Sequence, residues 1–152
     1  MRTSQTNAKP ITLDNLLLGH EFPCGAFTLT EAEIIGFASV YDPQPWHLDD
    51  AAARLTYFRG LCASGLHSQG AAIGLMVRAI SDVAIVAGGS LHEARFFVPV
   101  RPNQPYAVCA TWTAARASAS NPARGVASIT IVARNAAGVA VMECGVTYIV
   151  GR

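Results

Sequence analysis

The chain has 152 residues, of which 51% are hydrophobic and 14% are charged, and its formal net charge is +1. This length predicts one domain with a substantial core, and the low charge content predicts that part of the surface is hidden by self-association. The basic residues are scattered and all but Lys9 are arginine, so no basic stripe points to a nucleic-acid partner. No run of about eighteen apolar residues is present, which argues against a membrane span.

The N-terminal segment, residues 1–10, is polar and lacks the apolar core of a signal peptide. We therefore expect a loose tail at residues 1–10, a single domain over residues 11–152, and a cytoplasmic location. The cysteines are widely spaced and form no C-x-x-C pair, which favours buried free thiols over a zinc or redox site; they are Cys24, Cys62, Cys109 and Cys144.

The first half of the domain predicts a short strand over residues 21–29, followed by a helix. Thr30 and Glu33 form a capping box, and apolar residues then recur at helical spacing, so a helix is expected over residues 31–40. That helix should stop at Asp42-Pro43. Asp49 is the expected N-cap of a second, short helix over residues 51–55.

Two prolines dominate the segment between these helices. Each fixes its own φ and pushes the preceding residue towards extended geometry, so Asp42 and Gln44 are not expected inside a helix. His47 follows Asp42 by five positions. A rigid turn of this kind can aim a carboxylate and an imidazole into one space.

The stretch over residues 67–80 is apolar on nearly every side, yet too short to cross a membrane. It predicts a helix that the protein itself encloses. Ser64 and Gly65 stand just ahead of it, where backbone N–H groups are unpaired donors at the positive end of the helix.

After Gly88-Gly89 the hydrophobic pattern changes to a period of two, which predicts strands over residues 91–98, 106–114, 124–134 and 139–150. Short turns between consecutive strands predict an antiparallel meander. One enclosed helix and one antiparallel sheet make an α+β architecture. A sheet wrapped around a central apolar helix is the hotdog fold, which this pattern predicts.

Asp42, His47 and the helix start at Ser64-Gly65 together suit acid–base chemistry on a carbonyl compound. Each has an alternative reading. Asp42 could simply end a helix in an Asx turn, and His47 could be a structural histidine. A metal site made from His47, Asp49, Asp50 and His67 has no recognised ligand spacing, so no metal is predicted.

The segment Asp42-Pro-Gln-Pro-Trp-His47 resembles the D-x-N-P-x-H motif of the MaoC-like, (R)-specific enoyl-CoA hydratases. Residues 63–66, Ala-Ser-Gly-Leu, resemble the V/A-H-G-M segment that opens the hotdog helix in that family. Residues 97–102, Phe-Val-Pro-Val-Arg-Pro, resemble its P-V-x-P-G-D turn. The similarity runs over residues 27–148.

The resemblance implies that Asp42 and His47 hold a water that adds across the double bond of a trans-2-enoyl thioester, while the N–H of Gly65 takes the thioester oxygen. Gln44 replaces the usual Asn, and Ser64 replaces the usual His; both are candidate substrate-binding residues. Trp46 and His67 are further candidates for the pocket. Arg59, Arg95 and Arg101 could meet CoA phosphates, but the sequence favours solvated side chains.

The function expected on this basis is an (R)-specific enoyl-CoA hydratase, or 3-hydroxyacyl-CoA dehydratase. Its substrate would be an acyl-CoA or acyl-carrier thioester, without a metal or organic cofactor, and the protein would be a homodimer or larger assembly. Two alternatives stay open: a hotdog acyl-CoA thioesterase, in which Asp42 activates water on the thioester carbonyl, and a non-catalytic acyl-CoA-binding module.

Overall fold

The computed structural model describes residues 9–152. A short 3₁₀ helix, η1 (Leu13–Asn15), precedes strand β1 (Glu21–Thr28). Four helices follow: α1 (Glu31–Tyr41), α2 (Pro45–Leu48), α3 (Asp50–Arg54) and α4 (Gly65–Ala79). The chain ends in four strands: β2 (Ile85–Phe96), β3 (Pro105–Ala117), β4 (Arg124–Arg134) and β5 (Ala140–Gly151).

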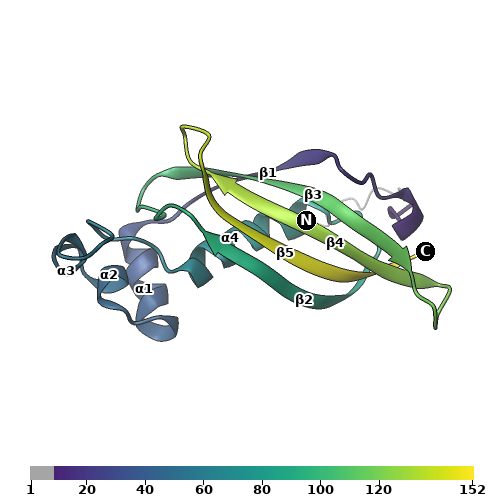
Figure 1. Cartoon of the computed structure of the whole chain (residues 1–152), viewed down its shortest axis with the longest axis horizontal. Coiled ribbons are helices and arrows are strands. Elements are labelled where there is room, and N and C mark those ends of the chain that lie inside the picture. Colours follow the sequence, from purple (N-terminus) through teal and green to yellow (C-terminus); the bar gives the residue numbers. More distant parts are fainter. Residues whose placement is uncertain (1–8) are drawn as a thin grey trace, which may run out of the picture.

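The strands form one antiparallel sheet in the order β1-β3-β4-β5-β2. Figure 1 shows α4 running along one side of this sheet, with α1, α2 and α3 gathered beyond one end of it. The expected α+β arrangement of a sheet around one helix is therefore confirmed. The expected simple meander holds only for β3, β4 and β5, because β2 pairs with β5 at the far edge and β1 pairs with β3.

The core lies between α4 and the facing side of the sheet. Alternate residues of β4 are buried, as its sequence pattern predicts; they are Gly125, Ala127, Ile129, Ile131 and Ala133. In β3 the alternate residues from Tyr106 to Trp112 are also buried. Ala114 breaks the pattern because the register with β4 shifts between Trp112 and Ala114, which leaves Ala114 exposed.

The helix ends lie close to where the local sequence predicts them. Thr30 and Glu33 form the predicted capping box, with Thr30 accepting from the Glu33 N–H at 3.2 Å and Glu33 accepting from the Thr30 N–H at 2.7 Å. Asp49 is the N-cap of α3, accepting from Ala52 N–H at 2.7 Å. Asp42 and Gln44 flank α1 and α2 rather than lying inside them.

The predicted enclosure of α4 is wrong for a single chain. Ser68, Ala72 and Met76 are buried, but Leu66 and Val77 are about half exposed. The sheet covers one side of the helix, and the apolar residues on its other side stay open. Strand β2 also begins six positions before the predicted strand over residues 91–98, because the edge strand tolerates Gly88-Gly89 beside bulges in its pairing with β5.

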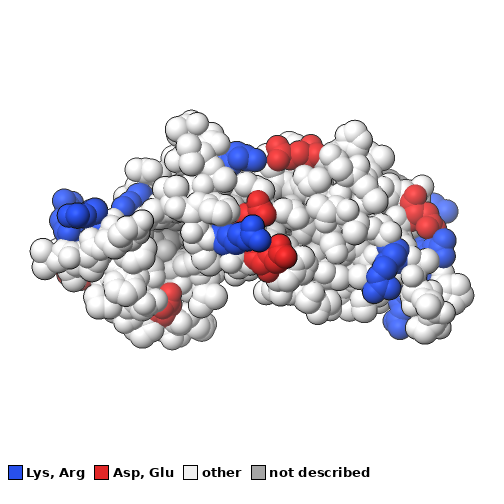
Figure 2. All heavy atoms as spheres, viewed as in Figure 1, with Lys and Arg blue, Asp and Glu red and all other residues white. Residues whose placement is uncertain are grey.

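The predicted loose tail at residues 1–10 lies almost wholly outside the described residues, which begin at Lys9. Within the described part of the chain, no helix combines the length and the apolar character that a membrane crossing requires. On the face shown in Figure 2, charged side chains form small separate groups of both signs, divided by broad uncharged areas.

Candidate active site

The carboxylate of Asp42 lies at the end of α1, where Pro43 stops the helix. Its Oδ2 accepts a hydrogen bond from the Ser64 hydroxyl, and its Oδ1 accepts one from the Gln44 amide, both at 2.7 Å. The Ser64 hydroxyl, with further help from Gln44 and His47, holds the pKa of Asp42 below its usual value, although partial burial acts in the opposite direction. Asp42 is therefore ionised at neutral pH.

The imidazole of His47 is buried in α2, with an exposed fraction of 5%. Its Nδ1 lies 2.7 Å from the carbonyl oxygen of Cys62, which can only accept, so the neutral ring carries its proton on Nδ1. The other nitrogen, Nε2, then has a free lone pair, and it accepts a hydrogen bond from the indole N–H of Trp46 at 3.1 Å. Both ring nitrogens are thus oriented by neighbouring groups.

His47 Nε2 and Asp42 Oδ2 lie 3.5 Å apart, and both are hydrogen-bond acceptors while His47 is neutral. Once a water takes the place of the Trp46 indole as donor to Nε2, it can donate to both acceptors at once and keep its own lone pairs free. The pair can therefore orient a nucleophilic water and accept a proton from it.

The start of α4 completes this group. Ser64 is fully buried and acts as the N-cap, accepting from Leu66 N–H at 3.2 Å while it donates to Asp42. The N–H of Gly65 has no acceptor within the described residues. A Cβ at Gly65 would come within 2.7 Å of the Phe96 ring, so only glycine allows Phe96 to pack directly on the helix start.

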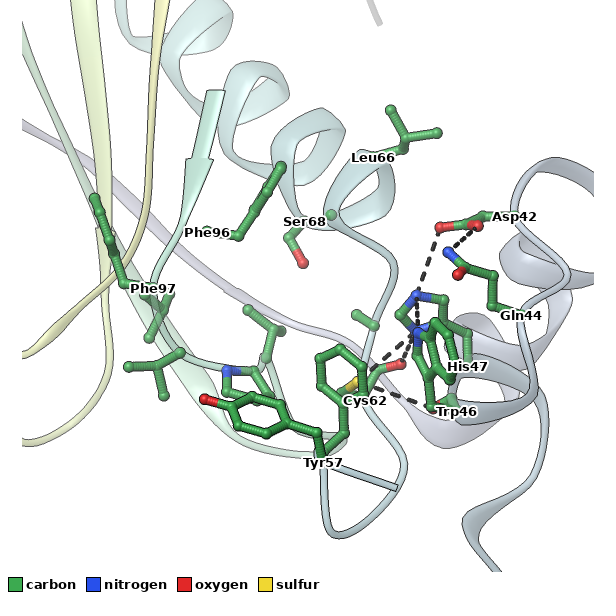
Figure 3. Close-up of a pocket in the computed structure, with 17 residues that line it drawn as sticks. Asp42, Gln44, Trp46, His47, Tyr57, Cys62, Leu66, Ser68, Phe96 and Phe97 are labelled. Atoms are coloured by element: carbon green, nitrogen blue, oxygen red, sulfur yellow. Dashed lines mark hydrogen bonds and ion pairs between the residues drawn. The ribbon is translucent and has the colours of Figure 1, made fainter. Parts of the chain in front are cut away.

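These groups open onto a cavity with a volume of about 470 Å³. Figure 3 shows Asp42 and His47 on one side of it and the rings of Phe96 and Phe97 opposite them. The rest of the wall is largely apolar and comes from the segment after α3, from the turn after β2 and from β5; it includes Tyr57, Phe58, Val98, Pro99, Val100 and Val141. The cavity thus joins an acid–base pair to an apolar surface.

The structure brings most of the predicted site residues together. Asp42, Gln44, Trp46, His47 and Gly65 line the cavity. Ser64 lies behind Asp42 as its hydrogen-bond donor.

His67 is placed elsewhere. Its ring stacks on Phe37 of α1, with ring centroids 4.5 Å apart, and it is not among the residues that line the cavity. Burial lowers the pKa of His67, although the Glu33 carboxylate acts in the opposite direction.

Sequence reasoning missed two contributions to the site. The Cys62 carbonyl, which orients His47, lies fifteen positions away from it in the chain, and the wall formed by Phe96 and Phe97 comes from β2 and the turn after it. No local pattern marks either contact. Burial also raises the pKa of the Cys62 thiol, although the Arg101 charge acts in the opposite direction, so this thiol is a poor nucleophile.

The family model of the MaoC-like domain matches residues 18–132 of this chain. The chain belongs to the MaoC-like domain family. Within the described residues of this MaoC-like chain, no group of three or more His, Cys, Asp or Glu side chains could hold a metal ion.

Two solved structures show how well the MaoC-like fold is matched. The chain is 31% identical to the MaoC-like dehydratase from Rhodospirillum rubrum, with a TM-score of 0.82, covering 93% of this chain and 97% of that one. It is 20% identical to the (R)-hydratase PhaJ1 from Pseudomonas aeruginosa, with a TM-score of 0.70 and coverage of 94% and 87%. At that lower identity the likeness shows the fold alone, and the hotdog fold is confirmed.

A curated relative, the uncharacterized protein YdeM of Bacillus subtilis, is 28% identical over 92 residues. The match covers 60% of this MaoC-like chain and 65% of the relative, so the chain spans just under two thirds of that protein's length.

Proposed function

We propose that this protein is an (R)-specific enoyl-CoA hydratase, which also runs in reverse as a 3-hydroxyacyl-CoA dehydratase. The observation that carries the proposal is the pair of acceptors, His47 Nε2 and Asp42 Oδ2, 3.5 Å apart at a cavity that Gly65 also lines. The N–H of Gly65 has no acceptor within the described residues. Hydration of an enoyl thioester needs these three elements: an oriented water, a proton carrier and a donor for the thioester oxygen.

In the proposed reaction, the water replaces the Trp46 indole as donor to His47 Nε2 and gives its second hydrogen bond to Asp42. Its oxygen bonds to C3 of the enoyl group, and its proton passes to Nε2. The electrons of the double bond move onto the thioester oxygen, where the N–H of Gly65 at the positive end of α4 stabilises the enolate. C2 then takes the proton from Nε2, so one water has been added and both side chains regain their starting state.

The different surroundings of the two side chains divide their roles. The hydrogen bond from Ser64, followed by that from Gln44, favours the ionised form of Asp42, which makes this carboxylate a weak proton acceptor. His47 is accordingly the proton carrier, and the negative charge of Asp42 stabilises the imidazolium that forms beside it.

The substrate in this proposal is an acyl-CoA or acyl-carrier thioester with an apolar acyl group, since the wall that faces the acid–base pair is largely hydrophobic. The MaoC-like dehydratase from Rhodospirillum rubrum, at 31% identity, supports the reaction class. The proposed chemistry uses only side chains and a backbone N–H, so we propose that it needs no metal or organic cofactor. Unchanged turnover after treatment with a chelator would support this.

We also propose that the protein works as a homodimer joined through β2. Every residue of β2 is exposed in the single chain, and the strand forms one edge of the sheet. Its exposed apolar side chains include Val86 and Leu91, and an unpaired edge of this length readily pairs with another strand. A second copy can add its own β2 to extend the sheet and can cover the open face of α4.

Incubation with crotonyl-CoA tests the reaction class. Loss of the enoyl absorbance without release of free thiol, giving (R)-3-hydroxybutyryl-CoA on chiral analysis, is the expected result. Release of free CoA would instead identify a thioesterase, and saturable binding with neither product would identify a binding module. An (S) product would also contradict the proposal.

The acid–base pair is tested by Asp42→Asn and His47→Ala. Asp42→Asn removes the negative charge and His47→Ala removes the proton carrier, so kcat should fall by about 10²–10⁴-fold in each while the circular dichroism spectrum stays unchanged. The double variant should lose far less than the product of the two single losses, because residues that act as a unit are not additive. Full turnover in either folded single variant would contradict the assigned roles.

A further inference from the structure

Arg101 lies in the turn between β2 and β3, and its guanidinium is bound by its own chain rather than by solvent. Nη1 donates to the carbonyl oxygens of Gly60 at 2.7 Å and Leu61 at 3.1 Å, and Nη2 donates to the carbonyl of Phe58. The expectation of a solvated side chain is therefore wrong. It failed because all three acceptors lie forty or more positions earlier in the chain.

The segment that Arg101 binds, residues 58–61, has an unusual backbone. Arg59 has a φ of 59° and Gly60 a φ of 152°, both in the region that L side chains rarely adopt. Asp50 also holds this segment, accepting from Leu61 N–H at 2.9 Å. A conformation of this kind persists only where its surroundings fix it, and Arg101 supplies three of the hydrogen bonds that do so.

Both ends of this segment lie next to groups that form hydrogen bonds with His47. At its first residue, the Phe58 ring packs on the Trp46 ring with centroids 5.2 Å apart, and Trp46 donates to His47 Nε2. Immediately after its last residue, the Cys62 carbonyl accepts from His47 Nδ1. The hydrogen bonds of both imidazole nitrogens therefore depend on where residues 58–61 are held.

Arg101 itself is well anchored. Its backbone N–H donates to the hydroxyl of Tyr106 at 2.7 Å, and Tyr106 is buried in the core. Next to it, the carbonyl of Val100 accepts from Ala63 N–H at 2.8 Å. Arg101 is thus anchored to the sheet, and its guanidinium holds residues 58–61, the segment beside the His47 imidazole, in a fixed position.

We propose that Arg101 is a positioning residue for His47: by binding the carbonyls of residues 58–61, it keeps the imidazole in one orientation and in the tautomer with its proton on Nδ1. A planar fork with several donors reaches three carbonyls at once, which the single ammonium of lysine does not reproduce. The tautomer is a property of the unliganded protein; the consequence for turnover rests on the proposed hydratase function.

The variants Arg101→Ala and Arg101→Lys test this, with Arg116→Ala as a matched loss of an exposed arginine from β3. Long-range ¹H–¹⁵N NMR of the imidazole rings reads the tautomer, and His47→Ala assigns the His47 signals. The wild type and Arg116→Ala should show a pyrrole-like Nδ1 and a pyridine-like Nε2. In both Arg101 variants these signals should move towards the averaged values of exchanging tautomers.

Turnover of crotonyl-CoA supplies the second readout. Because small misplacements of reacting groups can cost about 10²-fold, kcat of Arg101→Ala should fall by roughly that factor with little change in KM. Millimolar guanidinium should restore part of the lost kcat in Arg101→Ala and none in Arg101→Lys, where the ammonium fills the space. If Arg101→Ala does not fold, Arg101→Lys decides the NMR test.

Unchanged His47 signals in a folded Arg101 variant would overturn the proposal, as would a loss of kcat in Arg101→Ala that guanidinium leaves untouched. The NMR readout separates this outcome from failure of the hydratase function. A protein that hydrates no enoyl thioester still shows whether Arg101 sets the tautomer of His47.

Discussion

The hydroxyl of Ser64 forms two hydrogen bonds, and the two bonds have different effects. It donates to Asp42 and accepts from Leu66 N–H, so a single side chain both tunes the carboxylate and caps α4. The two effects can be separated by measurement, because one changes the titration of the Asp42 carboxyl and the other changes stability.

The variant Ser64→Ala should raise the pKa of Asp42. The Ser64 hydroxyl is the main cause of the lowered pKa of this carboxyl, and its removal leaves only the weaker help of Gln44 and His47 against the effect of burial. The proposed reaction stops when either Asp42 or His47 is protonated, so carboxyl ¹³C NMR, with Asp42→Asn to assign the signal, measures the shift directly. Loss of the cap should also lower the free energy of unfolding by about 1 kcal/mol.

Ser68→Ala is the matched control for this test. Ser68 is also buried, but its hydroxyl donates to the Ser64 carbonyl at 3.2 Å rather than to Asp42. Its removal should leave the pKa of Asp42 unchanged. Equal shifts in the two variants would show that the Ser64–Asp42 hydrogen bond does not control the titration.

The contact between helices α1 and α4 contains a histidine whose protonation should affect stability. The ring of His67 stacks on Phe37, and its Nδ1 is buried without a partner in the described residues. Burial lowers the pKa of His67, with Glu33 of α1 acting in the opposite direction, so the folded protein favours the neutral ring.

The free energy of unfolding should therefore decrease as the pH falls below about 6.5, the value for an unperturbed histidine, because the unfolded chain then binds the proton more readily. The dependence should end below the lowered pKa of the folded state. His67→Gln should flatten this part of the pH profile in urea unfolding experiments, whereas His20→Gln, at an exposed site, should keep it. An identical slope in the wild type and His67→Gln would contradict the assignment.

Elements whose cause is local could be predicted from the sequence. Thr30 and Glu33 mark the start of α1, and Pro43 excludes Asp42 from a helix; each acts within a few residues. The position of β2 could not be predicted in this way, since its partner β5 lies about fifty residues later and nothing in its own pattern names an edge. The same holds for the contacts of Arg101, because its acceptors lie within the loop that joins α3 to α4.

In the proposed homodimer, the edge strand β2 should hold the two copies of the chain together. Val86→Lys or Leu91→Lys places a charge on the exposed edge strand, which should shift sedimentation velocity at micromolar concentration from dimer to monomer. Activity should fall with dissociation, because Phe96 at the end of β2 and the adjacent Phe97 line the cavity.

Leu17→Lys is the control, since Leu17 is 72% exposed but lies before β1, away from the edge strand. It should leave the assembly unchanged. A wild-type protein that sediments as an active monomer would refute the dimer, and an intact dimer in both β2 variants would place its interface elsewhere.

The reactive pair and the wall opposite it come from stretches of chain far apart in the sequence: Asp42 and His47 precede α3, whereas Phe96, Phe97 and Val98 follow the main part of β2. Substitutions at residues 96–98 can therefore change the wall without changing Asp42 or His47. Under the proposed hydratase function, a duplicated gene could acquire a new acyl preference through three adjacent codons while Asp42 and His47 stay the same. For enzyme engineering, the same separation makes residues 96–98 the natural place for a small randomised library.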